Sequence, residues 1–125
     1  MSNVYIIASV KDDKMVAPTK VGRSDMPYSR LSALQTGSPI ELAIYAYFVV
    51  PTRDAAVTIE RWFRENNNER RNHGEWYNIA PSAAYSDVLR EIKIYLKQEY
   101  PDLLNYEKML ELAVSEIDWR DDRAH

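Results

Sequence analysis

A nearly continuous apolar stretch, residues 41–50, limits the architectures open to this chain. Nine of its ten residues are apolar or aromatic, and Glu41 at its start is the exception. A short stretch without polar alternation is typical of a β-strand whose two faces are both covered. We therefore expect this strand to be central in its sheet, with other elements packed on both sides.

Two shorter segments predict further strands. Residues 4–7 are β-branched or aromatic, and residues 19–22 form a second short run that ends in glycine. The polar residues 11–14 between them indicate a loop. A hairpin is the simplest connection, so we expect the first two strands to pair antiparallel.

Helical patterns follow the second and third strands. Residues 27–35 begin with proline and are followed by Gly37, the order expected of a short helix, and Leu31 and Leu34 can face a core while Arg30 points elsewhere. Thr52 is a suitable N-cap for a helix with an apolar stripe at helical spacing, and Glu60 lies at the margin of that stripe. This second helix should end in the polar residues 66–74, where Asn and Gly tolerate left-handed backbone.

Two more helices are predicted near the end of the chain. Residues 82–100 keep a helical period that Pro101 stops, and residues 103–117 describe a fourth helix with an acidic opposite side. The order of elements indicates an α+β fold, with a small three-stranded antiparallel sheet flanked by helices and extra C-terminal helices. A chain of 125 residues is expected to form one domain, residues 1–100, with the acidic helix of residues 101–125 packed on it.

Composition excludes several kinds of site. The chain has no cysteine, so disulfides and thiolate chemistry are excluded, and its three glycines form no phosphate-binding loop motif. The chain has two histidines, and neither lies in a sequence context typical of a serine-histidine-acid triad. Glu60 and Glu75 are expected to be isolated carboxylates. The absence of a leader pattern or an apolar run of about 20 residues predicts a soluble, cytoplasmic protein without membrane contact.

Charge is unevenly distributed along the chain. The net charge is −3, but seven of the 19 acids lie in residues 101–125, so the rest is nearly neutral. Cations are grouped around Lys20, Arg23 and Arg30 and again in residues 61–71. This grouping allows a positively charged cleft that binds nucleic acid, while an ordinary mixed-charge surface explains the same composition.

Several motifs in order resemble the GIY-YIG endonuclease superfamily, and more narrowly its phage-type and meiotically up-regulated subgroup with KVG and GEW motifs. The motifs are residues 4–7, 20–24, 30–31, 34–39, Glu60 and 74–77. The resemblance implies a DNA endonuclease that hydrolyses phosphodiester bonds with one metal ion, Mg²⁺ or Mn²⁺. It also implies that residues 1–100 are the nuclease domain.

The resemblance assigns roles to four catalytic residues. Tyr5 corresponds to the tyrosine near the attacking water, Lys20 to the second signature position, Arg30 to the arginine that contacts the scissile phosphate, and Glu60 to the metal ligand. A guanidinium and a metal ion suit the negative charge that builds up on a phosphoryl group. Tyrosine is a weak base at its usual pKa of about 10, so neighbouring cations such as Lys20 would have to favour the phenolate or orient the water.

Three more arginines, Arg23, Arg64 and Arg71, are expected to bind the substrate. Arg71 matches the arginine before the GEW motif, whereas Arg64 stands where the subgroup often has a histidine. The first signature also lacks its glycine, with Asn3 in that place. These departures leave an alternative function, a catalytically inactive module of the same fold that binds nucleic acid or a protein partner.

The remaining motif residues have structural interpretations. Without the resemblance, Tyr5 would be a core aromatic residue, and Glu60 an exposed partner of Arg64 one helical turn away. Glu75 is expected to cap or brace its turn, and Trp76 and Tyr77 to pack. The acidic C-terminal helix is expected to cover the core or to form an interface with a second copy or a protein partner.

Overall fold

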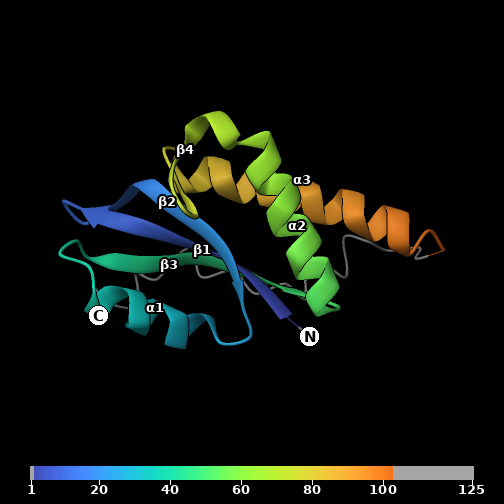
Figure 1. The fold of residues 1–125 in the computed structure, drawn as a ribbon, viewed down its shortest axis with the longest axis horizontal. Coiled ribbons are helices and arrows are strands. Elements are labelled where there is room, and N and C mark those ends of the chain that lie inside the picture. Colours follow the sequence, from blue (N-terminus) through green and yellow to red (C-terminus); the bar gives the residue numbers. More distant parts are fainter. Residues whose placement is uncertain (1, 103–125) are drawn as a thin grey trace.

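A five-stranded antiparallel sheet forms the centre of the computed structural model, which describes residues 2–102. Three helices pack on the sheet (Figure 1). The elements in chain order are β1 (Ser2–Lys11), β2 (Lys14–Ser24), α1 (Pro27–Thr36), β3 (Leu42–Val50), α2 (Arg53–Asn66), a 3₁₀ turn (Asn68–Arg70), β4 (Arg71–His73), β5 (Trp76–Tyr77) and α3 (Pro81–Glu99).

The α+β class is confirmed, but the prediction of a three-stranded sheet was wrong. The additional strands, β4 and β5, are three and two residues long. They form a small hairpin around Gly74, whose φ of 58° is the left-handed conformation expected at that turn. Strands this short carry no alternating pattern that could be detected in the sequence.

The apolar segment β3 lies at the edge of the sheet, so its predicted central position was also wrong. The strand order is β3-β1-β2-β5-β4. Both faces of β3 are nevertheless covered, because α1 packs on one side of the sheet and α2 with α3 on the other (Figure 1). A continuous apolar sequence therefore indicates that both faces of a strand are covered, but it does not indicate where the strand lies in the sheet.

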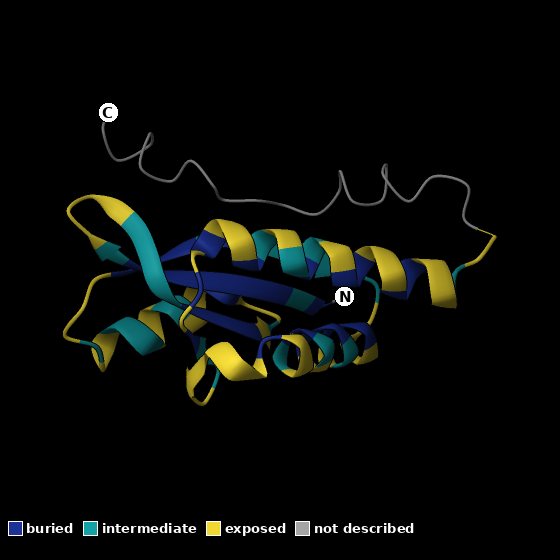
Figure 2. Ribbon diagram, turned by 90° about the horizontal axis from the view of Figure 1, so that it is seen from above, coloured by how far each residue is buried: buried dark blue, intermediate teal, exposed yellow. Residues whose placement is uncertain are grey.

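Residues of β1 alternate between two cores. Val4 and Ile6 face the larger core beneath α2 and α3, whereas Tyr5 and Ile7 face the smaller core beneath α1. Figure 2 shows the buried sheet between helices whose outward faces are exposed. The two cores divide the sheet into an α1 face and an α2 face.

The predicted hairpin between β1 and β2 is confirmed. The strands pair antiparallel, and the turn between them is made by Asp12 and Asp13, both in left-handed conformation with φ of 52° and 61°. Aspartate tolerates this conformation better than most residues, so a two-residue turn can form here without glycine.

The helix predictions agree with the structure where residues are described. Pro27 begins α1 and Gly37 directly follows it, and Leu31 and Leu34 pack on the smaller core. Thr52 caps α2 by accepting a hydrogen bond from the Ala55 amide at 3.0 Å. The predicted helix over residues 103–117 lies outside the described residues. Within residues 2–102, no helix has the length and apolar character needed to cross a membrane.

Candidate active site

Side chains from both faces of the sheet meet at the outer edge of β2. Strand β5 pairs with β2 only at Thr19 and Lys20, and a further bond joins the Val21 amide to the Glu75 carbonyl at 3.2 Å. Beyond this point, Gly22 and Arg23 lie on an edge that no strand covers within the described residues. Side chains from α1, α2 and the β4–β5 turn can therefore approach one another around this edge.

Tyr5 and Arg30 come from the α1 face. The Tyr5 side chain is fully buried, and the Arg30 guanidinium lies within hydrogen-bonding reach of its hydroxyl. Arg30 itself is exposed on α1, which places a cation at the surface within reach of the phenol hydroxyl. The exposed position of Arg30 agrees with the sequence prediction that Leu31 and Leu34, and not Arg30, pack on a core.

Gly22 makes room for the Tyr5 ring. The two residues are cross-strand partners in the β1–β2 ladder. A Cβ atom added to Gly22 would lie 2.6 Å from Cζ of Tyr5 and 2.9 Å from a carboxylate oxygen of Glu75, and it would meet the Tyr5 hydroxyl as well. The glycine of the KVG motif is thus required by close packing against the phenol.

Replacing Gly22 by alanine is therefore expected to destabilise the domain by about 1–3 kcal/mol, because the added methyl must displace the Tyr5 ring or the strand. Gly37→Ala is the matched control, since its Cβ would meet only a carbonyl oxygen 4.0 Å away and its backbone is not left-handed. Urea unfolding of both variants measures the difference. Equal stability of the two variants would contradict the close contact at Gly22.

Burial keeps Tyr5 in its neutral form. Removal of the side chain from water raises its pKa above the ordinary value of 10, although the hydrogen bond from Arg30 acts in the opposite direction. Lys20, which was expected to favour the phenolate, instead forms an ion pair with Glu75 at 2.9 Å. Burial thus disfavours a phenolate at Tyr5, and the ammonium of Lys20 is paired with a carboxylate.

Glu60 and Glu75 lie in contact, so the expectation of isolated carboxylates was wrong. They share a hydrogen bond, and the pKa of Glu60 is raised to about 7 by burial and by this carboxylate neighbour. Burial also acts to raise the pKa of Glu75, but the hydrogen bond from Glu60 and the charge of Lys20 hold it below the ordinary value. The two shifts thus favour a neutral carboxyl group at Glu60 and a carboxylate at Glu75.

The two carboxylates reach this position from different elements. Glu60 is buried on α2, whose apolar stripe packs on the larger core, and Glu75 lies in the turn between β4 and β5. They are 15 positions apart in the chain. Their contact depends on the hairpin of β4 and β5, which was not predicted. From the sequence, Glu75 was expected to cap or brace its turn.

The predicted substrate-binding arginines occupy different positions. Nε of Arg23 lies 3.5 Å from a Glu60 carboxylate oxygen, and Arg64 is close enough to Glu60 to lower its pKa. Arg71 donates a hydrogen bond to the carbonyl of Gly74, so it supports the turn that carries Glu75. The structure thus brings Arg23 and Arg64 beside the carboxylates, whereas the hydrogen bond of Arg71 is to the turn.

We call Tyr5, Lys20, Arg30, Glu60 and Glu75 the edge cluster. Four of its members were predicted from the sequence, and all four converge with Glu75 at the β2 edge. The cluster combines a buried phenol, a fixed guanidinium, an ammonium and a carboxylate pair. These groups can bind an anion on one side and a cation on the other.

Comparison with known families and proteins gives one finding. The family model described as the T5orf172 domain matches residues 3–94, which include every member of the edge cluster. Searches of curated proteins and of solved structures returned no match. Because the family model covers most of the chain, the chain belongs to the T5orf172 domain family, a phage-associated family of nuclease-like domains.

Proposed function

We propose that this protein is a metal-dependent DNA endonuclease that hydrolyses phosphodiester bonds at a GIY-YIG-type site. The observation that carries the proposal is the edge cluster, in which Arg30 and Tyr5 meet the Glu60–Glu75 carboxylate pair around one strand edge. The nuclease-like family and the order of the sequence motifs support the same function.

Arg30 is proposed to bind the scissile phosphate. A guanidinium can donate two parallel hydrogen bonds to phosphoryl oxygens, and Arg30 is held on a helix anchored by Leu31 and Leu34. Negative charge builds on these oxygens during hydrolysis, so a fixed cation lowers the barrier. Tyr5 lies beneath Arg30 and, as a neutral phenol, is proposed to position the attacking water by hydrogen bonding.

The carboxylate pair fits a hard divalent cation. Oxygen ligands are those that Mg²⁺ and Mn²⁺ prefer, and Mg²⁺ typically takes one or two protein carboxylates and keeps several waters. Glu60 and Glu75 are the proposed ligands, because their carboxyl groups lie in contact. They form a pair, and residues 2–102 contain no group of three or more His, Cys, Asp or Glu side chains suited to a metal. When bound, the metal would supply stabilisation of phosphoryl charge and activation of water.

Lys20 is proposed to hold the second carboxylate in place. Its ammonium is nearly buried, lies 2.9 Å from the Glu75 carboxylate and faces the ring of Trp76. Arg23 and Arg64 lie beside Glu60, and Arg71 lies near Tyr77. These three arginines are proposed to bind phosphates of the DNA backbone. Together these cations can offset the net negative charge of the chain near the substrate.

The test is nicking of supercoiled plasmid by the purified protein. We expect nicked and linear DNA in the presence of Mg²⁺ or Mn²⁺ and none in EDTA, because the carboxylate pair requires a cation to act. Restoration of nicking when Mg²⁺ is added back controls for damage by the chelator. Nicking that persists in EDTA would contradict a metal-dependent mechanism.

One observation favours a second candidate function, a non-catalytic module that binds DNA. Arg23 forms an ion pair with Glu60, and this guanidinium can take the place of a metal at the carboxylate. DNA binding that falls with salt, without cleavage under either metal, would support this alternative. The same result would exclude the endonuclease.

A further inference from the structure

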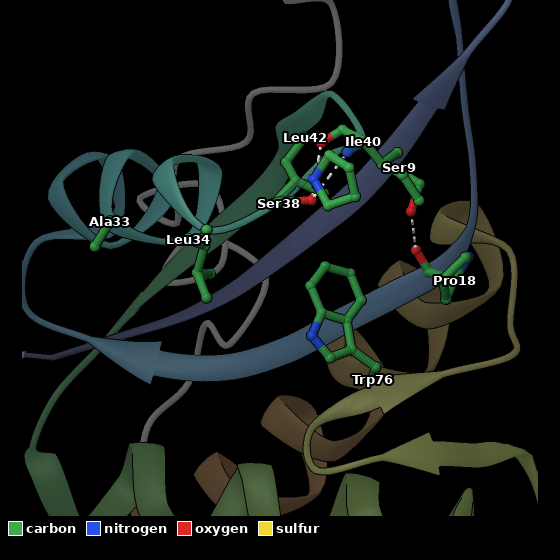
Figure 3. A pocket seen from close by; sticks show the side chains of 10 residues that line it. Ser9, Pro18, Ala33, Leu34, Ser38, Ile40, Leu42 and Trp76 are labelled. Carbon is green, nitrogen blue, oxygen red and sulfur yellow. Dashed lines mark hydrogen bonds between the residues drawn. The ribbon is translucent and has the colours of Figure 1, made fainter.

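A cavity of about 430 Å³ lies on the α1 face beside the edge cluster. Its walls come from β1, β2, α1, the turn before β3 and the short strand β5. Figure 3 shows the indole of Trp76 pointing into the space between Leu34, Ser38 and Pro18. The cavity is open on one side, so a group attached to a larger molecule can enter it.

The lining of the cavity carries no charged side chain. The lining residues are Ser9, Pro18, Ala33, Leu34, Gly37, Ser38, Pro39, Ile40, Leu42 and Trp76. The hydroxyls of Ser9 and Ser38 donate hydrogen bonds to the carbonyls of Pro18 and Ile40, at 2.9 and 3.0 Å. A phosphate or a metal ion would find no counter-charge here, whereas a flat apolar group with polar edges would fit.

The cavity lies next to the edge cluster. Trp76 directly follows Glu75 in the chain and is the cross-strand partner of Lys20, whose Nζ lies 5.6 Å from the centre of the indole ring. Leu34 lies one helical turn after Arg30 on α1, so both project from the same side of that helix. A molecule held by Arg30 and Lys20 can therefore extend directly onto Trp76.

We propose that the cavity receives one unpaired nucleobase of the DNA strand, next to the phosphate at Arg30, and that this base stacks on Trp76. The inference rests on the proposed function, because it takes the cations of the edge cluster as the phosphate site. A base inside a duplex is stacked and paired, and cannot reach a side cavity unless it is extruded. The substrate class is therefore DNA with an unpaired nucleotide at the scissile phosphate, as in single strands, flaps or mismatches.

Binding of a single-stranded oligothymidylate in EDTA tests the subsite without any cleavage. We expect binding to quench tryptophan fluorescence, and we expect Trp76→Leu to abolish most of the quenching and weaken binding about tenfold to a hundredfold. Trp76→Phe, which keeps an aromatic surface, should retain most of the affinity. A duplex of equal length should bind all three proteins alike, since its bases stay stacked.

A second variant keeps the test valid if Trp76→Leu fails to fold. Ala33 is exposed on α1 and lines the cavity, so Ala33→Leu fills part of the cavity and replaces no residue of the buried core or of the edge cluster. It should weaken binding of the single strand and leave duplex binding unchanged. Equal affinity of wild type and Ala33→Leu for the single strand would overturn the proposal.

Failure of the subsite and failure of the endonuclease give different results. If duplex and single-stranded DNA are cleaved equally and Trp76→Leu slows neither, the base subsite is wrong and the endonuclease stands. If no DNA is cleaved but the single strand still quenches Trp76, the endonuclease is wrong and the base subsite is supported. Absence of any single-strand binding would overturn the subsite.

Discussion

Replacing Glu60 by glutamine is expected to abolish metal-dependent cleavage and, at the same time, to stabilise the domain at pH 8. Loss of the carboxylate removes a proposed metal ligand, and the loss of transition-state stabilisation is expected to lower the cleavage rate by about three orders of magnitude. Glutamine keeps the shape of the side chain and can still donate a hydrogen bond to Glu75. The expected loss of activity is therefore chemical and involves no loss of fold.

The gain in stability follows from the raised pKa of Glu60. Its pKa is about 7 in the folded protein, against 4.5 as the ordinary value. A carboxyl group with a raised pKa contributes stability below its unfolded pKa, and this contribution is lost as the pH rises through the folded pKa. Between pH 4.5 and 7 the wild type should thus lose stability that the permanently neutral glutamine keeps.

Urea unfolding in EDTA at pH 5 and pH 8 measures this difference. At pH 8 we expect Glu60→Gln to exceed the wild type by an amount on the order of 2 kcal/mol, and at pH 5 by much less. Glu65→Gln is the matched control, because Glu65 lies on the same helix but is exposed and forms an ion pair with Arg61. A variant at Glu60 that cleaved DNA normally would remove Glu60 from the proposed mechanism.

Replacing Arg30 by lysine is expected to lower cleavage almost as far as replacing it by alanine. Removal of one donor to developing charge slows related reactions about a hundredfold to a thousandfold. Lysine restores the positive charge but not the planar pair of donors that holds two phosphoryl oxygens. The Arg30→Lys variant should therefore recover only a small part of the activity lost in Arg30→Ala.

Rates of cleavage and salt-dependent DNA binding should be measured together for these variants. Arg61→Lys and Arg61→Ala are matched controls, since Arg61 is half exposed on α2 and forms an ion pair with Glu65. Both control variants are expected to cleave like the wild type. Full activity of Arg30→Lys would show that positive charge alone suffices. It would contradict the proposed pair of parallel hydrogen bonds from Arg30 to the phosphate.

Local sequence patterns predicted most of the elements in residues 2–102. Helix ends depend on interactions between residues close together in the chain, so they can be predicted directly from the sequence. Examples are the cap at Thr52, the proline that begins α1 and the glycine that follows this helix. The strands β4 and β5 were missed because they are too short to show a period. The edge position of β3 was missed because its apolar residues indicate that helices cover both faces of the strand. They do not indicate the order of the strands in the sheet.

The residue types and spacing of the sequence determined the chemistry available to the site. Tyr5, Lys20, Arg30 and Glu60 could be named in advance because they stand in ordered motifs on predictable elements. Only the tertiary structure decided how these groups act. It buried Tyr5 against Gly22, and it brought Glu75 to Glu60 through a hairpin that no local pattern encodes. Burial and long-range contact set the pKa values of Tyr5, Glu60 and Glu75, since both depend on distances in space and not on separation along the chain.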